Sequence, residues 1–225
     1  MFPNPLPQIS AVLPGPGWAR LGADSAGVLL DGQPLVTGWL APDIESANRV
    51  VADLTLLIEY VVEHDGAAYL AEDRSGIAVW AGATEPLPPV AALRRSTVDP
   101  HYAARWAALE GVLRSTVPDG ARGEVLVLLA MAGDGPVAGQ LAAELLRQHH
   151  RVLDQQERPA CTAAYTIELR WLLARHGWTA GPRGHLPDGS PWWPMHRRPQ
   201  PPTTPSTPST PSVRPAAGGR IWWAT

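Results

Sequence analysis

The stretch Val125-Leu-Val-Leu-Leu-Ala-Met131 is an unbroken apolar run, and Gly133-Asp134-Gly135-Pro136 follows it almost at once. A run of this length is typical of a central strand that is covered on both faces. The glycines and the proline predict a turn. Beyond the turn, apolar residues recur at helical spacing as far as Leu153. The segment from Met131 to Leu146 is therefore expected to contain a buried strand, a turn and an amphipathic helix.

Outward from this junction, strand-like and helix-like segments alternate. Helical periodicity is present in 44–62, 102–113 and 167–175. Strands are predicted at 28–30 with 35–36, 68–70, 77–80, 160–165, 178–186 and 192–195. This interleaving indicates an α/β fold in which helices cover a mixed sheet.

The domain organisation follows from composition and length, since 225 residues are enough for one domain and a tail. Residues 1–19 contain several prolines and are expected to form a flexible arm, and residues 20–198 form the domain. Residues 199–225 are rich in Pro, Thr and Ser, which predicts a disordered tail. Trp222 and Trp223 near its end are either a tethered docking peptide for a protein partner or part of an end without function.

Charge and cysteine content exclude several classes of protein. The net charge is −3, close to neutral for 225 residues, so nucleic acid is not an expected partner. All 18 basic residues are arginine, so the chain contains no lysine. No apolar run approaches the length of a membrane span, and the N-terminus does not resemble a signal peptide, so no membrane association and a cytoplasmic location are expected. Cys161 is the single cysteine. No metal site is predicted, because His149 and His150 are adjacent on a helix and point about 100° apart.

The turn before the long helix is a candidate anion site. Backbone N–H groups at a helix N-terminus lack partners within the helix, and the helix dipole favours negative charge there. A pyrophosphate could bind at such a place in a chain without lysine. The same pattern also occurs in α/β proteins where it only packs a helix on a sheet.

Four short phrases resemble the GNAT superfamily of acyl-coenzyme A-dependent N-acyltransferases, in its actinobacterial form. Trp39-Leu40-Ala41-Pro42-Asp43 resembles the opening of their first helix, and Gly76-Ile-Ala-Val-Trp80 resembles one of their strands. Arg175-His176-Gly177-Trp178 is similar to the phrase after their last core helix. The segment Leu186-Pro-Asp-Gly-Ser-Pro-Trp-Trp-Pro-Met195 is similar to their closing phrase. The resemblance implies a largely antiparallel, V-shaped central sheet, with acetyl-CoA bound in the splay beside the buried strand.

On the family pattern, the cofactor site begins at Met131 and Ala132 and continues into the pyrophosphate loop. The loop consensus is Gln/Arg-x-x-Gly-x-Gly/Ala, and its six positions fall on Val137, Ala138, Gly139, Gln140, Leu141 and Ala142. Only Ala142 fits this consensus. Valine replaces the first residue, and glutamine replaces the middle glycine, where it would crowd a phosphate without removing the N–H donors.

The resemblance also places the catalytic groups. The family's tyrosine, which protonates the leaving thiolate, corresponds to Leu173, and leucine cannot donate a proton. Tyr165 is the nearest phenol in the sequence and is the candidate acid. Glu124, at the start of the buried strand, is the candidate base for the amine, the alternative being a solvated surface glutamate.

Two functions stay open on the sequence alone. One is an acetyltransferase that transfers the acetyl group of acetyl-CoA to a small-molecule or peptide amine. The other is an inactive enzyme that keeps the fold and acts as a binding or regulatory module. The substitutions at 137, 140 and 173 favour the second function, whereas the order of the elements favours the first.

Overall fold

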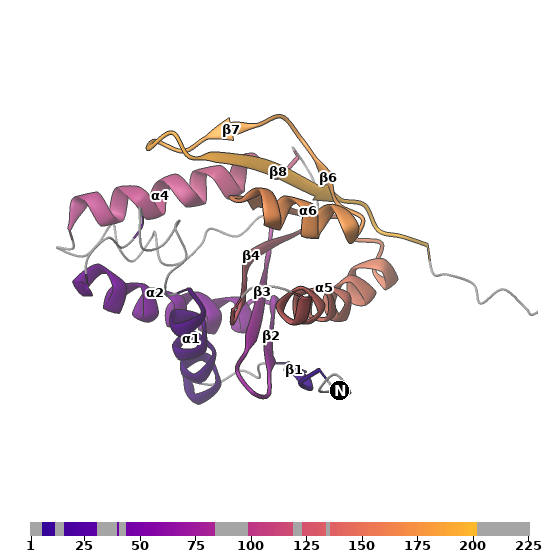
Figure 1. Cartoon of the computed structure of the whole chain (residues 1–225), viewed down its shortest axis with the longest axis horizontal. Coiled ribbons are helices and arrows are strands. Elements are labelled where there is room, and N and C mark those ends of the chain that lie inside the picture. The colour runs from indigo at the N-terminus through magenta and orange to yellow at the C-terminus, as the bar shows by residue number, and fades with distance from the viewer. Residues whose placement is uncertain are drawn as a thin grey trace, which may run out of the picture.

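A computed structural model describes residues 6–11, 16–30, 40, 44–83, 99–118, 123–133 and 136–201 (Figure 1). Its helices are α1 (Pro16–Leu30), α2 (Ile44–Glu63), α4 (Pro100–Ser115), α5 (Pro136–Gln155) and α6 (Ile167–Arg175). Its strands are β1 (Ile9–Ala11), β2 (Ala67–Ala71), β3 (Gly76–Gly82), β4 (Glu124–Met131), β5 (Ala160–Ala164), β6 (Thr179–Ala180), β7 (Gly184–His185) and β8 (Pro191–Arg197).

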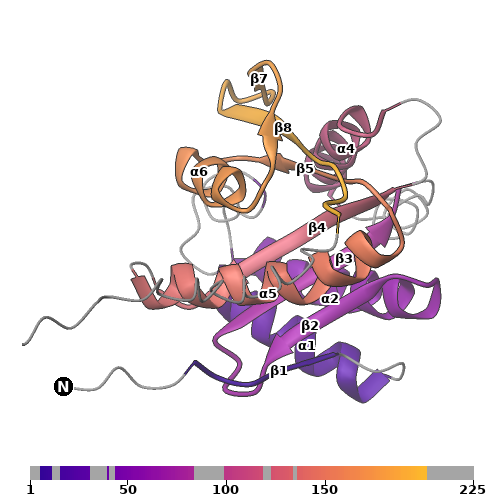
Figure 2. The same ribbon diagram turned by 90° about the vertical axis from the view of Figure 1, so that its right-hand side faces the viewer.

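The strands form one sheet in the order β1-β2-β3-β4-β5-β8-β6, and β7 pairs with β8. Every pairing is antiparallel except that of β4 with β5, which is parallel. The hairpin of β2 and β3 lies beside the long strand β4, while β5 and β8 continue the sheet on the other side (Figure 2). The predicted α/β class with a mixed, largely antiparallel sheet flanked by helices is confirmed.

The sheet opens between its two parallel strands. β4 and β5 pair only at Glu124 with Ala160 and at Val125 with Cys161. Just beyond these pairs, Thr162 Oγ1 donates a 2.6 Å hydrogen bond to the carbonyl oxygen of Leu126. On its other edge β5 pairs with β8 along its whole length, whereas the rest of β4 keeps a strand partner only in β3. The edge of β4 that faces β5 is therefore open from Val127 onwards.

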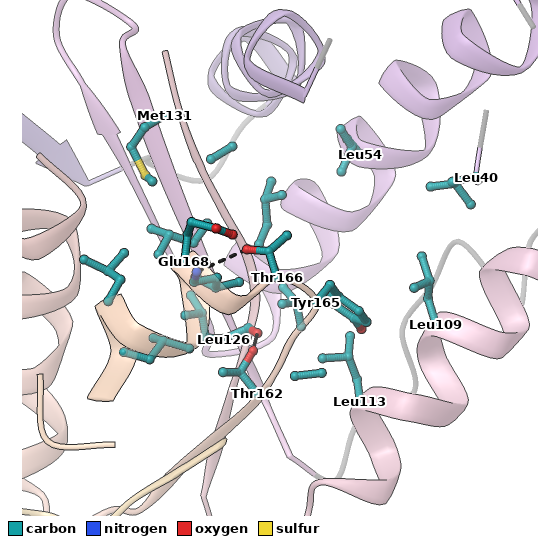
Figure 3. Close-up of a pocket in the computed structure, with 18 of the residues that line it drawn as sticks. Leu40, Leu54, Leu109, Leu113, Leu126, Met131, Thr162, Tyr165, Thr166 and Glu168 are labelled. Carbon is teal, nitrogen blue, oxygen red and sulfur yellow. Dashed lines mark hydrogen bonds between the residues drawn. The ribbon is translucent and has the colours of Figure 1, made fainter. Parts of the chain in front are cut away.

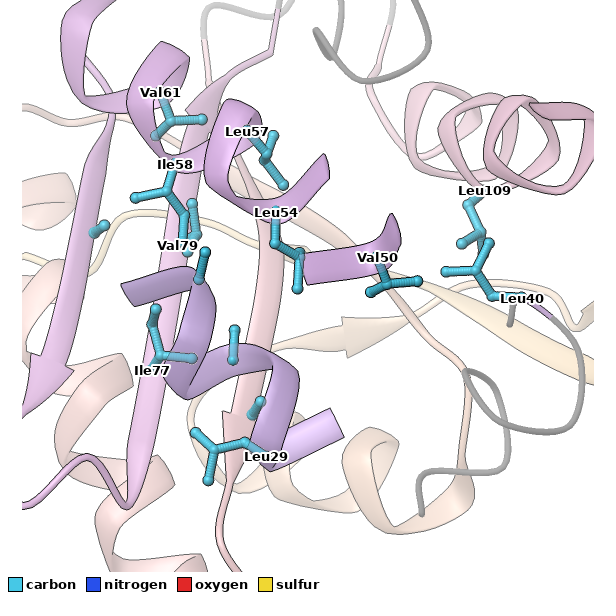
Figure 4. Packing of buried hydrophobic residues seen from close by; sticks show 14 of the residues in the cluster. Leu29, Leu40, Val50, Leu54, Leu57, Ile58, Val61, Ile77, Val79 and Leu109 are labelled. Carbon is cyan, nitrogen blue, oxygen red and sulfur yellow. The ribbon is translucent and has the colours of Figure 1, made fainter. Parts of the chain in front are cut away.

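Helices cover both faces of the sheet. One core cluster joins α1, α2 and α4 to β2 and β3, with Ile58 and Ile77 fully buried in it (Figure 4). A second cluster, on the opposite face, joins α5 and α6 to β3, β5 and β8, with Leu145, Leu173 and Met195 fully buried. Among the described residues, no helix is both long and apolar enough to span a membrane.

The N-terminal part of the chain differs from the sequence-based expectation. The predicted strand at 28–30 is wrong, since these residues form the end of α1. Small residues allow α1 to pack closely on α2. Ala23 and Ala26 are fully buried, and a Cβ at Gly27 would lie 2.5 Å from Val51 of α2. Part of the expected flexible arm is also ordered, as 9–11 form β1 on the edge of β2. Residues 35–36 and 202–225, and with them the tail tryptophans, lie outside the described residues.

Candidate active site

A cavity of about 450 Å³ lies in the opening between β4 and β5 (Figure 3). Its floor is β4 from Leu126 to Met131, and α6 forms one wall with residues between Glu168 and Leu173. One end reaches the turn after β4, and the other end lies between α2 and α4. The cavity therefore follows the open edge of the strand along its length.

The first end of the cavity is formed by the strand–turn–helix junction that the sequence singled out. Met131, Gly133, Ala138 and Gly139 line it. Pro136 opens α5 and has no N–H to donate, so the free donors of the first turn are those of the next three residues. A Cβ built on Gly139 would meet no atom within 4 Å, so there is open space at this point of the helix.

The remaining predicted cofactor residues lie around this end in different orientations. Ala132 is exposed beside the turn, and Val137 and Gln140 are exposed on α5, with 69% of Val137 accessible. Leu141 and Ala142 are buried in the core under α5, where Leu141 packs on Gly76 of β3. The side chains of these last two residues thus point away from the cavity.

Tyr165 lines the cavity directly after β5. Its ring lies beside Leu109 and Leu113 of α4 (Figure 3), and its hydroxyl is buried without a hydrogen-bond partner in the described structure. Burial raises the pKa of this phenol, so the group stays protonated at neutral pH. An unpaired buried hydroxyl is costly, and a polar atom of a ligand in the cavity would satisfy it.

Leu173, at the position of the family tyrosine, also lines the cavity. It is fully buried in the cluster under α5 and α6. Thr166 caps α6, accepting a 3.1 Å hydrogen bond from the backbone N–H of Leu169, and so fixes the direction of the helix. The chain therefore presents leucine to the cavity at the place where the family pattern has a phenol.

Glu124 lies outside the set of cavity-lining residues and is not on the surface either. Its carboxylate is 2.5 Å from Nε2 of His149 and 2.8 Å from the guanidinium of Arg158. Nδ1 of the same histidine is 3.0 Å from the hydroxyl of Tyr69, and its ring stacks on Trp80. Glu124 and His149 are both buried. The carboxylate thus anchors the start of β4 to α5, and its geometry does not suit a base for an amine in the cavity.

Neither of the two adjacent histidines is arranged as a metal ligand. His150 accepts a 3.3 Å hydrogen bond from the indole N–H of Trp178. Burial, aided by the positive charge of Arg197, lowers the pKa of His150 to about 3, so the imidazole is neutral. Within the described ranges, no group of three or more His, Cys, Asp or Glu side chains could hold a metal ion.

The second end of the cavity was not predicted from the sequence as part of a site. Its residues from α2 and α4 follow a helical period, and this pattern alone predicts packing against a core. A stripe of buried residues on a helix has the same pattern whether it faces a core or a cavity. The residues of α2 and α4 line a cavity because the sheet opens between β4 and β5.

Comparisons with known proteins give a consistent result for the fold. No model of a known protein family matches the sequence, and no curated protein matches it. Among solved structures, a histone acetyltransferase HPA2-related acetyltransferase from Corynebacterium glutamicum is similar, with a TM-score of 0.61, 16% identity and coverage of 88% of this chain and 99% of that one.

Two further structures extend the comparison. A mosquito arylalkylamine N-acetyltransferase-like protein has a TM-score of 0.56 and 8% identity, covering 85% of this chain and 100% of that one. An agmatine N-acetyltransferase has a TM-score of 0.51 and 14% identity, covering 84% of this chain and 99% of that one. The open β4–β5 pair and these alignments over nearly the whole of each neighbour agree. The chain therefore has the fold of the GNAT N-acetyltransferases.

Proposed function

We propose that this chain is an acyl-CoA-dependent N-acetyltransferase that transfers an acetyl group from acetyl-CoA to an amine. The observation that carries the proposal is the cavity itself, which runs along the open edge of β4 from the first turn of α5 to the space between α2 and α4. One elongated ligand and one acceptor could meet in it end to end. The solved structures with this fold include enzymes named for two kinds of amine, so the fold alone does not choose the acceptor.

The residues at the first end fit acetyl-CoA in shape and donors. The unpaired backbone groups of β4 beyond Val127 would bind the amides of the pantetheine arm, and the N–H groups of Val137, Ala138 and Gly139 would bind the pyrophosphate. The open space at Gly139 allows a phosphate to approach the backbone closely. When bound, acetyl-CoA supplies an activated thioester. Gln140 points to solvent, so it does not fill this space.

In the transfer step, the amine nitrogen attacks the thioester carbonyl carbon. A C–N bond forms, the C–S bond breaks, and the leaving thiolate takes up a proton. The nitrogen loses one proton after the attack, and this proton returns to the group that protonated the thiolate. Tyr165 is the proposed proton donor, because its side chain lines the cavity and its hydroxyl is unpaired and remains protonated. Holding the two reactants in register in the cavity could contribute up to about 7–11 kcal/mol of the barrier reduction.

A second function, binding without catalysis, is supported by one specific observation. Leu173 occupies the cavity wall at the position of the family acid and cannot protonate a thiolate. In this alternative the cavity holds acetyl-CoA or another ligand and no transfer follows.

The proposal is tested by calorimetric titration of the full chain with acetyl-CoA, followed by release of free thiol in the presence of a mixture of primary amines. We expect binding in the micromolar range and thiol release that depends on the amine. Tyr165→Phe should keep the binding and lower the rate, whereas Gln140→Gly should bind at least as tightly as the native chain. Binding without any thiol release would favour the second function. Absence of binding in both the native chain and Gln140→Gly would overturn the proposed site.

A further inference from the structure

The second end of the cavity has walls from two helices that face each other. From α2 come Val50, Leu54 and Leu57, spaced at four and three residues. From α4 come Leu109 and Leu113, and Leu40 closes the space between the two helices. Figure 4 shows Leu40 and Leu109 close together, with Val50 of α2 facing them. All six side chains are buried and apolar.

Charged groups are scarce at this end. Among the described residues that line the whole cavity, the carboxylates are those of Glu110 and Glu168. Glu110 accepts two hydrogen bonds from the guanidinium of Arg114, at 2.9 and 2.8 Å, so its charge is already paired. Glu168 is exposed in the first turn of α6, on the other side of the opening. Of the carboxylates among the described lining residues, an ammonium group placed between α2 and α4 would therefore lie near the paired Glu110 alone.

The position of these walls relative to Tyr165 fixes which part of a ligand they contact. Tyr165 lies where β5 ends, with Leu109 and Leu113 beside its ring (Figure 3). The reacting atoms belong near its hydroxyl, so the body of the acceptor extends from there toward Leu40 and Val50. The leucine-lined space therefore surrounds the part of the acceptor that does not react.

We infer that the acceptor is a primary amine on an apolar body, an aryl or alkyl group, and not a polyamine or an amino sugar. This inference rests on the proposed function and adds the substrate class. Burial of a second ammonium group or of several hydroxyls would remove their hydration without providing partners. For an alkyl group, by contrast, each methylene that is transferred from water into the cavity raises the binding affinity about fourfold.

The experiment compares two amines of equal length, n-pentylamine and putrescine, which differ only in a terminal methyl group against an ammonium group. Binding of each to the CoA-saturated full chain is measured by calorimetry, and turnover with acetyl-CoA is measured in parallel. We expect n-pentylamine and phenethylamine to bind and react at least about tenfold better than putrescine. Equal or tighter binding of putrescine, or binding of no amine at all, would overturn the inference.

A pair of variants on α2 provides the matched control. Leu54→Glu places a carboxylate in the wall and should shift the preference toward putrescine by at least about tenfold. Leu56→Glu adds the same charge on the same helix, at a side chain that is 43% exposed, and should leave the preference unchanged. If Leu54→Glu does not fold, the preference of the native chain for n-pentylamine over putrescine still tests the inference.

Two outcomes separate this inference from the proposed function. Tight acetyl-CoA binding together with a preference for putrescine would overturn the substrate class and leave the acetyltransferase proposal standing. Failure of CoA and acetyl-CoA to bind would contradict the proposed function itself. Octanoyl-CoA binding tighter than acetyl-CoA, with no binding of n-pentylamine, would show that the leucine-lined space holds the acyl chain, and this would overturn the inference.

Discussion

The hydroxyl of Tyr102 donates a 2.6 Å hydrogen bond to Oδ2 of Asp53, and both side chains are buried. The bond joins α4 to α2, the two helices that wall the second end of the cavity. Burial raises the pKa of Asp53, while the hydrogen bond and the nearby Arg49 act in the opposite direction. The spacing of the two walls thus depends on a polar contact within an otherwise apolar region.

Tyr102→Phe should therefore lower the free energy of unfolding by about 1–3 kcal/mol, because the buried carboxylate loses its donor. Denaturant unfolding followed by tryptophan fluorescence measures the loss. Asp53→Asn keeps an acceptor for the tyrosine and is the control, with a smaller expected cost at neutral pH. Equal stability of Tyr102→Phe and the native chain would show that the bond does not hold the walls together.

Gly139→Ala should separate stability from ligand binding. The added methyl group meets no atom within 4 Å, so the helix should gain up to about 1 kcal/mol in propensity. The same methyl group would stand where a phosphate approaches the backbone, so calorimetry should show weaker acetyl-CoA binding. Gly111→Ala in α4 also meets open space and should stabilise the chain by a similar amount without any effect on affinity.

Leu173→Tyr should raise the turnover rate if proton donation to the thiolate limits it, since general acid catalysis typically contributes about 10²–10⁴-fold. Leu173 lines the cavity, so the hydroxyl of a tyrosine at this position would be directed toward it. Leu173→Phe adds nearly the same volume without the hydroxyl, and it should not show the gain. A similar rate for both variants would mean that Tyr165, or a step other than protonation, sets the rate.

Glu124→Gln distinguishes a structural carboxylate from a catalytic one. The variant removes the carboxylate charge that contacts Arg158 and His149, and a hydrogen bond to a charged group contributes about 1.5–3 kcal/mol. We expect a large loss in denaturant unfolding, with turnover per folded molecule close to that of the native chain. A stable variant with abolished turnover would instead restore Glu124 as the base.

Acid should destabilise the chain through His150. Its pKa in the folded chain is about 3, below the ordinary 6.5, so the unfolded chain binds the extra proton between these values. The contribution of the neutral His150 to the free energy of unfolding is therefore fully present above pH 6.5. It falls as the pH drops toward 3, by about 1.4 kcal/mol per pH unit at most. His150→Gln should reduce the slope of the free energy of unfolding against pH by the equivalent of one bound proton, measured by denaturant unfolding between pH 3 and 6.5. An unchanged slope would contradict a neutral buried imidazole.

Much of the fold could be predicted from the sequence, because local pattern and tertiary environment agree. The apolar run of β4 and the periodicity of α2 and α5 appear in the structure nearly as expected. The predicted strand at 28–30 was wrong, because the close packing of Gly27 of α1 on Val51 of α2 is a tertiary contact, whereas the turn-forming residues Asp31 and Gly32 directly follow the segment in the sequence. Turn-forming residues indicate where an element ends and do not identify its type.

The site was less predictable, for a physical reason. Glu124 was expected at a strand mouth or on the surface, yet His149 and Arg158 from distant segments bury it. Tyr165 is the phenol nearest to Leu173 in the sequence, and both residues line the cavity. Side chains that line a sheet opening do not recur at a fixed spacing in the sequence. Their proximity follows from how β4 pairs with β5, which the sequence pattern does not reveal.

The contact between Gly76 and α5 has a consequence for how this site can vary. A Cβ at Gly76 would lie 2.8 Å from Leu141, so the helix rests directly on the backbone of β3. β3 supplies none of the cavity-lining residues, yet the absence of one methyl group at Gly76 allows Leu141 of α5 to pack this closely on the sheet. The amino acids of the loop can therefore differ from a family consensus, while the packing of α5 on β3 still holds the backbone N–H groups of the loop in place.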